Sequence, residues 1–158
     1  MKLVDLLQIN YIKYPLTASN KVDVIKELLA LFSENNLIQN HEEVLKAVLE
    51  REKILSTGLG NGVALPHCKT NSVEEFMIAL GIHPKGVDFQ SLDHKPAHII
   101  FLLIGPESKP GFHIRLLSRI SRIISKEDVR KQILAGKSPE EIYQIFQAEE
   151  ANFFEISL

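Results

Sequence analysis

The sequence predicts an α/β domain in which helices pack on a small β-sheet. Residues 76–82 and 98–105 are apolar runs with the length and composition of buried strands, and segments with helical periodicity lie before and after them. The second run is almost continuously apolar, which is typical of a strand in the interior of a fold. The connections between the elements differ in length, and this favours a mixed sheet over a purely parallel one.

Two helices are expected before the strands. The first spans residues 19–35, where apolar residues recur at steps of three and four, and Ser19 or Asn20 can cap its first turn. The second begins near Asn40 and runs to about Lys53. The buried stripes are Val24, Leu28, Leu31 and Phe32 in the first helix and Val44, Leu45, Val48 and Leu49 in the second.

The segment between the second helix and the strands is expected to be a loop. Residues 56–62 contain three glycines in five positions, and the short apolar run 63–65 is stopped by Pro66. Because the loop follows a helix, and Val63 stands where a third glycine would be needed, it is not a dinucleotide-binding fingerprint.

Three further helices are expected after the strands. The first covers residues 112–125, and the second covers residues 126–135 and ends at Gly136. The third begins at Ser138, which can act as the cap, with Pro139 at the first helical position and Glu141 completing a capping box. The row formed by Arg115, Arg119 and Arg122 is expected to be a solvated face, with protein docking as the alternative.

The composition describes a globular chain without a basic excess. Of 158 residues, 45% are hydrophobic and 24% are charged, and the net charge is −2. These values exclude disorder and indicate a single domain, residues 1–158, with a core large enough to fold unaided. Proteins that bind nucleic acid normally carry a basic excess, so nucleic acid is not expected as a partner.

No signal for export, membrane insertion or metal binding is found. The first residues lack the apolar stretch of a signal peptide, and no apolar run approaches the roughly 18 residues of a membrane span. The single cysteine, Cys68, cannot form an internal disulfide. His94 and His98 have a spacing found in metal sites, but Pro96 between them argues against a helix that aligns their rings. We therefore expect a cytoplasmic protein without a metal site or direct membrane insertion. His41 and His83 are expected at the surface.

Residues 51–68 contain the main candidate for chemistry. Glycines allow a backbone to approach an anion closely and to point several N–H groups at it. His67 directly follows Pro66, whose restricted backbone favours a ring held in one direction. Imidazole titrates near neutrality, so a neutral ring nitrogen is available as a nucleophile. A phosphoryl group on this ring would need cationic and hydrogen-bonding neighbours.

Two side chains elsewhere in the chain are candidates for these neighbours. Arg51 lies at the end of the second helix. His113 is in phase with the apolar residues of its own helix, so it points toward the sheet from the first turn, where a helix favours a nearby anion. Taken one by one, these residues also have plain structural roles: a loop histidine at 67, a solvated charge at 51 and a hydrogen-bonded core histidine at 113.

The run from Glu52 to Cys68, above all Leu-Gly-Asn-Gly-Val-Ala-Leu-Pro-His, resembles the active-site signature of a known family. This family comprises the enzyme IIA domains of the fructose–mannitol class, which are components of the bacterial phosphoenolpyruvate-dependent phosphotransferase system. Further matching motifs follow in the same order at 89–93, 102–106, 113–118 and 138–143, so the resemblance extends over nearly the whole chain. Cys68 departs from the pattern, because the family usually has glycine there.

The resemblance implies a type-2 enzyme IIA domain over residues 1–158, with a mixed sheet flanked by helices on both sides. It implies an enzyme component without a cofactor that carries a phosphoryl group on Nε2 of His67, with His113 and Arg51 as the other catalytic residues. The N–H groups of the glycine loop are expected to hold phosphoryl oxygens. The candidate phosphate-binding residues are Gly60, Asn61, Gly62 and Thr57, although the alternative for Thr57 is a role in the loop backbone.

The resemblance also implies partners. The donor would be a phosphohistidine on HPr or its nitrogen-branch paralogue, and the acceptor would be a IIB domain or a regulated target protein. A nitrogen-type regulator is favoured, because no IIB or IIC segment follows within the 158 residues and fructose-type domains are often fused to such parts. The alternatives are a sugar-transport enzyme IIA that donates to a fructose- or mannitol-type IIB domain, and a binding module that retains the fold without the chemistry.

Overall fold

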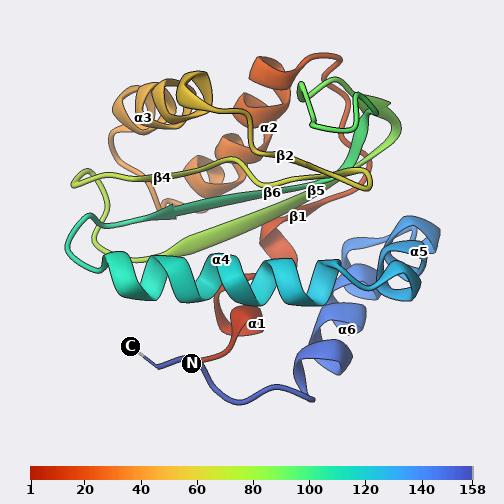
Figure 1. Cartoon of the computed structure of the whole chain (residues 1–158). Coiled ribbons are helices and arrows are strands. Elements are labelled where there is room, and N and C mark those ends of the chain that lie inside the picture. Colours follow the sequence, from red (N-terminus) through yellow and green to blue (C-terminus); the bar gives the residue numbers. More distant parts are fainter. Residues whose placement is uncertain (158) are drawn as a thin grey trace.

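The computed structural model describes residues 1–157, which form a six-stranded mixed sheet with helices on both faces (Figure 1). The long strands β5 and β6 are antiparallel, whereas β1 is parallel to β5, and β3 and β4 are parallel to β6. Strand β2 completes the order β1-β5-β6-β3-β2 and is antiparallel to β3. The mixed sheet confirms the predicted fold class. The strands are β1 (Ile12–Lys13), β2 (Gly58–Gly60), β3 (Val63–Ala64), β4 (His67–Lys69), β5 (Met77–Val87) and β6 (Ala97–Gly105).

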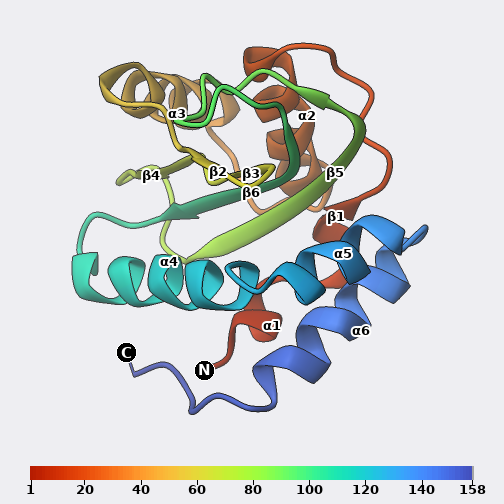
Figure 2. The same cartoon turned by 45° about the vertical axis from the view of Figure 1, so that its right-hand side comes forward.

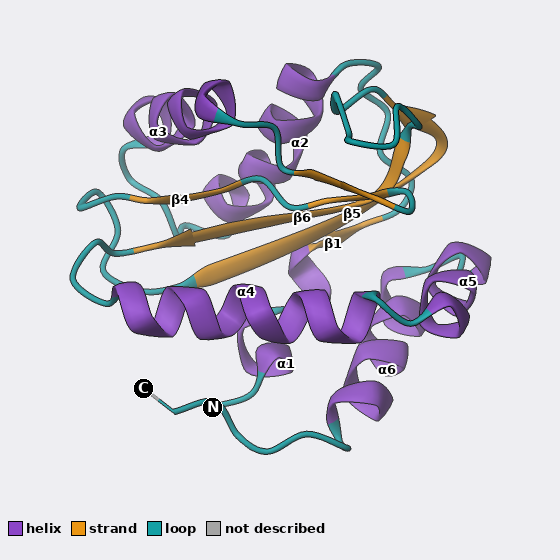
Figure 3. Ribbon diagram, in the orientation of Figure 1, coloured by secondary structure: helices purple, strands orange, loops and turns teal. Residues whose placement is uncertain are grey.

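The helices form two layers, as Figures 1 and 3 show. Helices α2 and α3 cover one face of the sheet, and α1, α4, α5 and α6 cover the other; the turned view in Figure 2 shows α4 beneath β5 and β6. The helices are α1 (Leu3–Leu6), the 3-10 turn η1 (Ile9–Tyr11), α2 (Lys21–Glu34), α3 (His41–Ile54), α4 (Pro110–Ile124), α5 (Glu127–Ala135) and α6 (Pro139–Glu150). Among residues 1–157, no helix has the length and apolar character needed to cross a membrane.

The core lies on both sides of β6. Ile99, Phe101 and Leu103 pack with the helices of the α4 layer, whereas Ile100 and Leu102 pack with the α2 and α3 layer. Successive side chains of a strand point to opposite faces, so a strand covered on both faces must be apolar at every position. This double burial explains the continuous apolar run in the sequence.

The predicted helix starts are largely confirmed. Asn20 caps α2 by accepting a hydrogen bond from the backbone N–H of Asp23, and Ser138 caps α6 by accepting one from the N–H of Glu141. The second half of the predicted capping box is wrong in detail, because the Glu141 carboxylate accepts from the N–H of Lys137. The donor that it satisfies lies one residue before the cap.

The short apolar run at 63–65 corresponds to β3, whereas β1, β2 and β4 were not predicted; the short strands matter most for the site. The structure forms β2 from part of the predicted glycine loop, and β3 and β4 lie one after the other along β6. Leu65 and Pro66 interrupt that line. Proline has no N–H to donate to a ladder, so the chain departs from regular pairing at this point. His67 begins β4 directly after the interruption.

One expectation about surface residues is corrected, and another holds in part. His83 is buried on β5, where its Nε2–H donates to the carbonyl of Ala18. In the arginine row on α4, Arg115 and Arg122 are exposed as expected, whereas Arg119 is partly buried and forms an ion pair with the buried Glu150. Arg115 also donates to the carbonyl of Ser157, because residues after α6 turn back across α4.

Candidate functional site

A cavity of about 590 Å³ lies where β4 meets the ends of α3 and α4. Strand β4 pairs with β6 and lies off the main strand order, so helices from both layers reach its side chains. Its lining consists of Ala47, Arg51, His67, Cys68, Lys69, Glu107, His113, Ile114 and Leu117. The structure thus brings the three predicted catalytic residues, Arg51, His67 and His113, to one cavity.

The ring of His67 is held through one nitrogen. Its Nδ1 lies 2.7 Å from the carbonyl oxygen of Leu65, and since a carbonyl only accepts, Nδ1 carries the proton. In a neutral ring this leaves the lone pair on Nε2. Burial is the main cause that lowers the pKa of His67; the bond to Leu65 opposes this effect, and the charge of Arg51 adds to it. The ring is therefore neutral at neutral pH and can act as a nucleophile.

His113 lies in the first turn of α4 and is only 3% exposed. Its ring centroid lies 5.7 Å from that of His67 and 6.0 Å from that of Phe76. Neither of its ring nitrogens has a hydrogen-bond partner among the described residues, which is unusual for a buried polar group. Burial, followed by the neighbouring His67 and Lys69, lowers the pKa of His113 to about 4. The neutral ring therefore offers one unused N–H donor to a group bound in the cavity.

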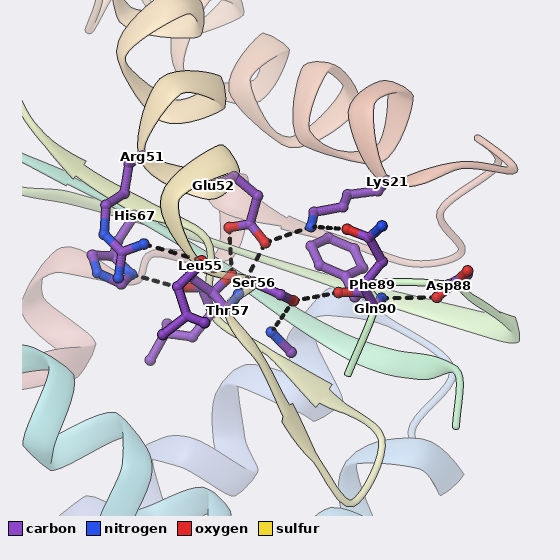
Figure 4. Close-up of polar contacts among 12 residues, drawn as sticks. Lys21, Arg51, Glu52, Leu55, Ser56, Thr57, His67, Asp88, Phe89 and Gln90 are labelled. Carbon is purple, nitrogen blue, oxygen red and sulfur yellow. Dashed lines mark hydrogen bonds and ion pairs between the residues drawn. The ribbon is translucent and has the colours of Figure 1, made fainter. Parts of the chain in front are cut away.

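Arg51 lies in the last turn of α3, and Figure 4 shows its guanidinium beside the ring of His67. Its Nη1 donates to the carbonyl of Leu55 at 3.1 Å, so the side chain also caps the end of its own helix. A guanidinium has five N–H donors in a planar fork. Arg51 can therefore cap its own helix with one N–H group and still offer others to an anion.

The four residues expected to bind phosphate lie outside this cavity. Gly60 ends β2, Asn61 and Gly62 form the turn to β3, and the N–H of Asn61 donates to Asp93. Val63 pairs with Ile99 and His67 with Leu103, so the start of β3 is four residues, about 13 Å, from His67 along β6. Thr57 is 5% exposed, and both its N–H and its hydroxyl are bonded to Glu52. The hairpin places the glycines at the far end of the strand line.

Two residues of the cavity were missed by the sequence analysis. Lys69 lies two positions after His67 in the same strand, so the two side chains share a face of β4. That period-two relationship is visible in the sequence once His67 is assigned to a strand. Glu107 follows β6 and accepts a hydrogen bond from Asn71. Nothing in the local sequence indicates that Glu107 reaches this cavity.

Cys68 lines the cavity, but its side chain lies on the face of β4 opposite to those of His67 and Lys69. Its side chain is 4% exposed and packs with the apolar residues beneath α2 and α3. Burial raises the pKa of the Cys68 thiol to about 12, so the thiolate is not formed near neutral pH. The core accommodates a small side chain at this position. The thiol is therefore not expected to contact a group bound in the cavity.

Known proteins match this chain over most of its length. The family model described as "Phosphoenolpyruvate-dependent sugar phosphotransferase system, EIIA 2" matches residues 5–149. The fructose-specific EIIABC component of Bacillus subtilis is 37% identical over 145 residues, which are 92% of this chain and 23% of that protein. The chain therefore spans about a quarter of the length of this relative.

Solved structures share the fold. The crystal structure of the nitrogen regulatory protein IIA-Ntr from Neisseria meningitidis superposes with a TM-score of 0.85 at 30% identity, covering 91% of this chain and 98% of that one. The mannitol IIA enzyme of Escherichia coli, solved in complex with phosphorylated IIB, has a TM-score of 0.77 at 19% identity, with 90% and 99% covered. At that identity the second likeness concerns the fold alone.

Proposed function

The chain belongs to the EIIA type 2 family of the phosphoenolpyruvate-dependent sugar phosphotransferase system, and from this premise we propose that it carries a phosphoryl group on Nε2 of His67. One observation supports the assignment above the others: the Nδ1–H of His67 is bonded to the Leu65 carbonyl, so the lone pair resides on Nε2. His67 lines a cavity that also contains an arginine and an unpaired histidine.

The proposed step is an in-line transfer between two imidazoles. The Nε2 lone pair of His67 attacks phosphorus, and the N–P bond of a donor phosphohistidine breaks with its electron pair returning to the donor ring. The phosphorylated ring of His67 keeps its proton on Nδ1 and carries the positive charge that the donor ring loses. The hydrogen bond to the Leu65 carbonyl becomes stronger as that charge develops.

The neighbours of His67 have distinct tasks in this step. The free N–H groups of Arg51 and the N–H of neutral His113 bind the equatorial oxygens of the transferred group. Lys69 adds a positive charge at the rim of the same cavity. Phosphoryl transfer requires mainly positioning and charge stabilisation, so these three donors are sufficient without a cofactor.

The proposed donor is the phosphohistidine of an HPr-type phosphocarrier protein, and the exchange is assigned to the cytoplasm. The acceptor is a regulated target protein or a IIB domain, and no nucleic acid is involved. We favour the nitrogen-type regulator, since the IIA-Ntr structure of N. meningitidis aligns over 98% of its length at 30% identity. The transport role is the second candidate, favoured by the 37% identity to a fructose-specific EIIABC component.

Phosphorylation with enzyme I, an HPr-type carrier and radiolabelled phosphoenolpyruvate tests the proposal. The protein should acquire an acid-labile, alkali-stable label, and His67→Ala should acquire none. His94→Asn is a matched control, because His94 is exposed and has a φ of 59°, which asparagine tolerates. Label on His67→Ala, or none on the unaltered protein, would overturn the assignment; the second result would favour a binding module without chemistry.

Transfer of the label distinguishes the two branches. The labelled protein is mixed with a fructose-type IIB domain, and the loss of label from His67 is followed in time. Rapid transfer to IIB would support the transport role. Retention of the label, together with binding to a target protein that differs between the labelled and unlabelled forms, would support the regulator.

A further inference from the structure

We propose that Glu52 is a positioning residue for His67: acting through Thr57, it holds the Leu65 carbonyl that selects the Nδ1–H tautomer of the ring. The inference deepens the proposed function and rests on it for its catalytic consequence. Its structural part, the choice of tautomer, can be tested separately from phosphoryl transfer.

The carboxylate of Glu52 is buried, with the residue 7% exposed, and it accepts two hydrogen bonds and forms one ion pair. Its Oε1 accepts from the N–H of Thr57 at 2.9 Å, its Oε2 accepts from the hydroxyl of Thr57 at 2.7 Å, and Nζ of Lys21 lies 2.8 Å from Oε1. Figure 4 shows these contacts between the end of α3, the chain before β2 and the start of α2. A buried carboxylate is tolerated only when it is paired in this way.

Two further hydrogen bonds connect Thr57 to the ring of His67. The carbonyl of Thr57 accepts from the N–H of Leu65 at 3.0 Å, and the carbonyl of Leu65 accepts from Nδ1 of His67 at 2.7 Å. Among the described residues, Glu52 makes no hydrogen bond to the ring. Its charge acts on His67 through space and opposes the lowering of the His67 pKa, whereas its hydrogen bonds act on the ring's position through Thr57 and Leu65. Glu52, Thr57 and Leu65 are buried, and His67 is partly buried.

The Leu65–Pro66 peptide explains why such support is needed. Pro66 has no N–H, so this peptide plane cannot be held by a donor of its own in the β-ladder. Its orientation depends on two flanking hydrogen bonds: the N–H of Leu65 donates to the carbonyl of Thr57, and the N–H of Leu103 donates to the carbonyl of Pro66. Thr57 in turn lies outside regular pairing, between α3 and β2, and is held by Glu52. Loosening Thr57 therefore frees the carbonyl that faces His67.

Lys21 completes the arrangement from the first turn of α2. Its ammonium also lies 5.5 Å from the ring centroid of Phe89 and 3.4 Å from Oε1 of Gln90. It balances the charge of Glu52 and ties α2 to α3. In this arrangement the two bonds to Thr57 set the position of the carboxylate, and the ion pair with Lys21 compensates its charge.

The tautomer of His67 is measured by ¹⁵N NMR at a pH where the ring is neutral, in the unaltered protein and in Glu52→Ala. We expect mainly the Nδ1–H form in the first and a ratio shifted about tenfold toward Nε2–H in the second, which is the effect of about one net hydrogen bond. The rate of phosphoryl acceptance should fall in proportion to the fraction of rings that remain in the Nδ1–H form, because the Nε2–H form has no lone pair on Nε2. Glu50→Ala is the matched control on the same helix, since Glu50 is exposed, and it should change neither quantity.

Two milder variants keep the test decisive. Glu52→Gln retains an oxygen that can accept from the N–H of Thr57 and should restore most of the native tautomer ratio. Thr57→Val removes one bond to Glu52 while keeping the backbone, and it should shift the ratio about threefold. If Glu52→Ala does not fold, the tautomer ratio of His67 in Thr57→Val tests the positioning role. A native ratio in folded Glu52→Ala or in Thr57→Val overturns the positioning role, whereas a shifted ratio in a protein that accepts no phosphate overturns only the proposed function.

Discussion

The imidazole rings of His67 and His113 lie 5.7 Å apart, centroid to centroid, at an angle of 53°. One ring begins β4 at the edge of the sheet, and the other lies in the first turn of α4. Burial lowers both pKa values, so the pair is neutral at neutral pH. Under the proposed function, His67 is the nucleophile and His113 is a hydrogen-bond donor to the transferred group.

Replacing His113 by alanine should slow acceptance of the phosphoryl group by about 10²–10³-fold without abolishing it. The change removes a donor to the equatorial oxygens but leaves Nε2 of His67 available. Initial rates of labelling from the phosphorylated carrier measure the effect. A rate equal to that of the unaltered protein would show that His113 is a core residue without a part in the transfer.

Arg51→Lys should slow the transfer by about tenfold or more, because a lysine cannot offer the planar fork of N–H groups. The unfolding free energy should change by less than about 1 kcal/mol, since Arg51 is at the partly exposed end of α3, and its bond to Leu55 is a capping contact. Labelling rates and urea unfolding of the same preparation separate the two effects. A loss of stability that matches the loss of rate would point to a purely structural arginine.

The rate of acceptance should stay constant as the pH falls to 6.5, the ordinary pKa of histidine, and should decline only below it. The pKa of His67 is lowered mainly by burial, and protonation removes the Nε2 lone pair, so the acid limb lies at lower pH than for a free imidazole. The measurement is a pH profile of initial labelling rates, with the carrier titrated separately. A decline that begins above pH 6.5 would contradict the lowered pKa.

The unfolding free energy should decrease as the pH falls from 6.5 toward 4 because of His113. Its pKa is about 4 in the folded protein and 6.5 ordinarily, so the unfolded chain binds more protons in this window. The full effect is about 3 kcal/mol and is reached below pH 4. Urea unfolding at several pH values should show a weaker dependence in His113→Gln than in the unaltered protein. Equal slopes would mean that other groups cause the loss.

Arg119→Ala should reduce the unfolding free energy by about 3 kcal/mol while leaving phosphorylation of His67 intact. Glu150 is fully buried and accepts from the N–H groups of Leu3 and Val4 as well as from Arg119, so the variant leaves a buried carboxylate without its cation. Lys131→Ala, which breaks the exposed pair with Glu127, should change the stability by less than about 0.5 kcal/mol. Equal effects of the two substitutions would refute the buried pair as the cause.

Most of the fold could be predicted because its main elements have strong local patterns. Helices α2, α3 and α4 present apolar residues at helical spacing, and β6 is apolar throughout because both of its faces are covered. The strands β1, β3 and β4 have two or three residues each, which is too short for any periodicity to be visible. Their positions depend on pairing with β5 and β6, which lie at a distance from them in the sequence.

For the candidate site, the sequence predicted the three side chains that meet at the cavity but not the position of the glycine turn. The motif around Pro66 and His67 and the phase of His113 in its helix pointed to three side chains that the structure places at one cavity. The glycine turn was expected at the same place, but the hairpin of β2 and β3 carries it to the other end of the strand line. A loop that is close in sequence need not be close in space when a strand lies between.

The sequence by itself determined which histidine is the candidate nucleophile and which face of each main helix is buried, since both follow from the order of residue types along the chain. Only the tertiary structure decided which nitrogen of that ring is free, and that Glu52 and Thr57 stand behind the Leu65 carbonyl. Local patterns report whether a residue is buried. Hydrogen-bond partners, in contrast, depend on the register of strands and on where each helix ends, and these are settled by contacts between distant parts of the chain.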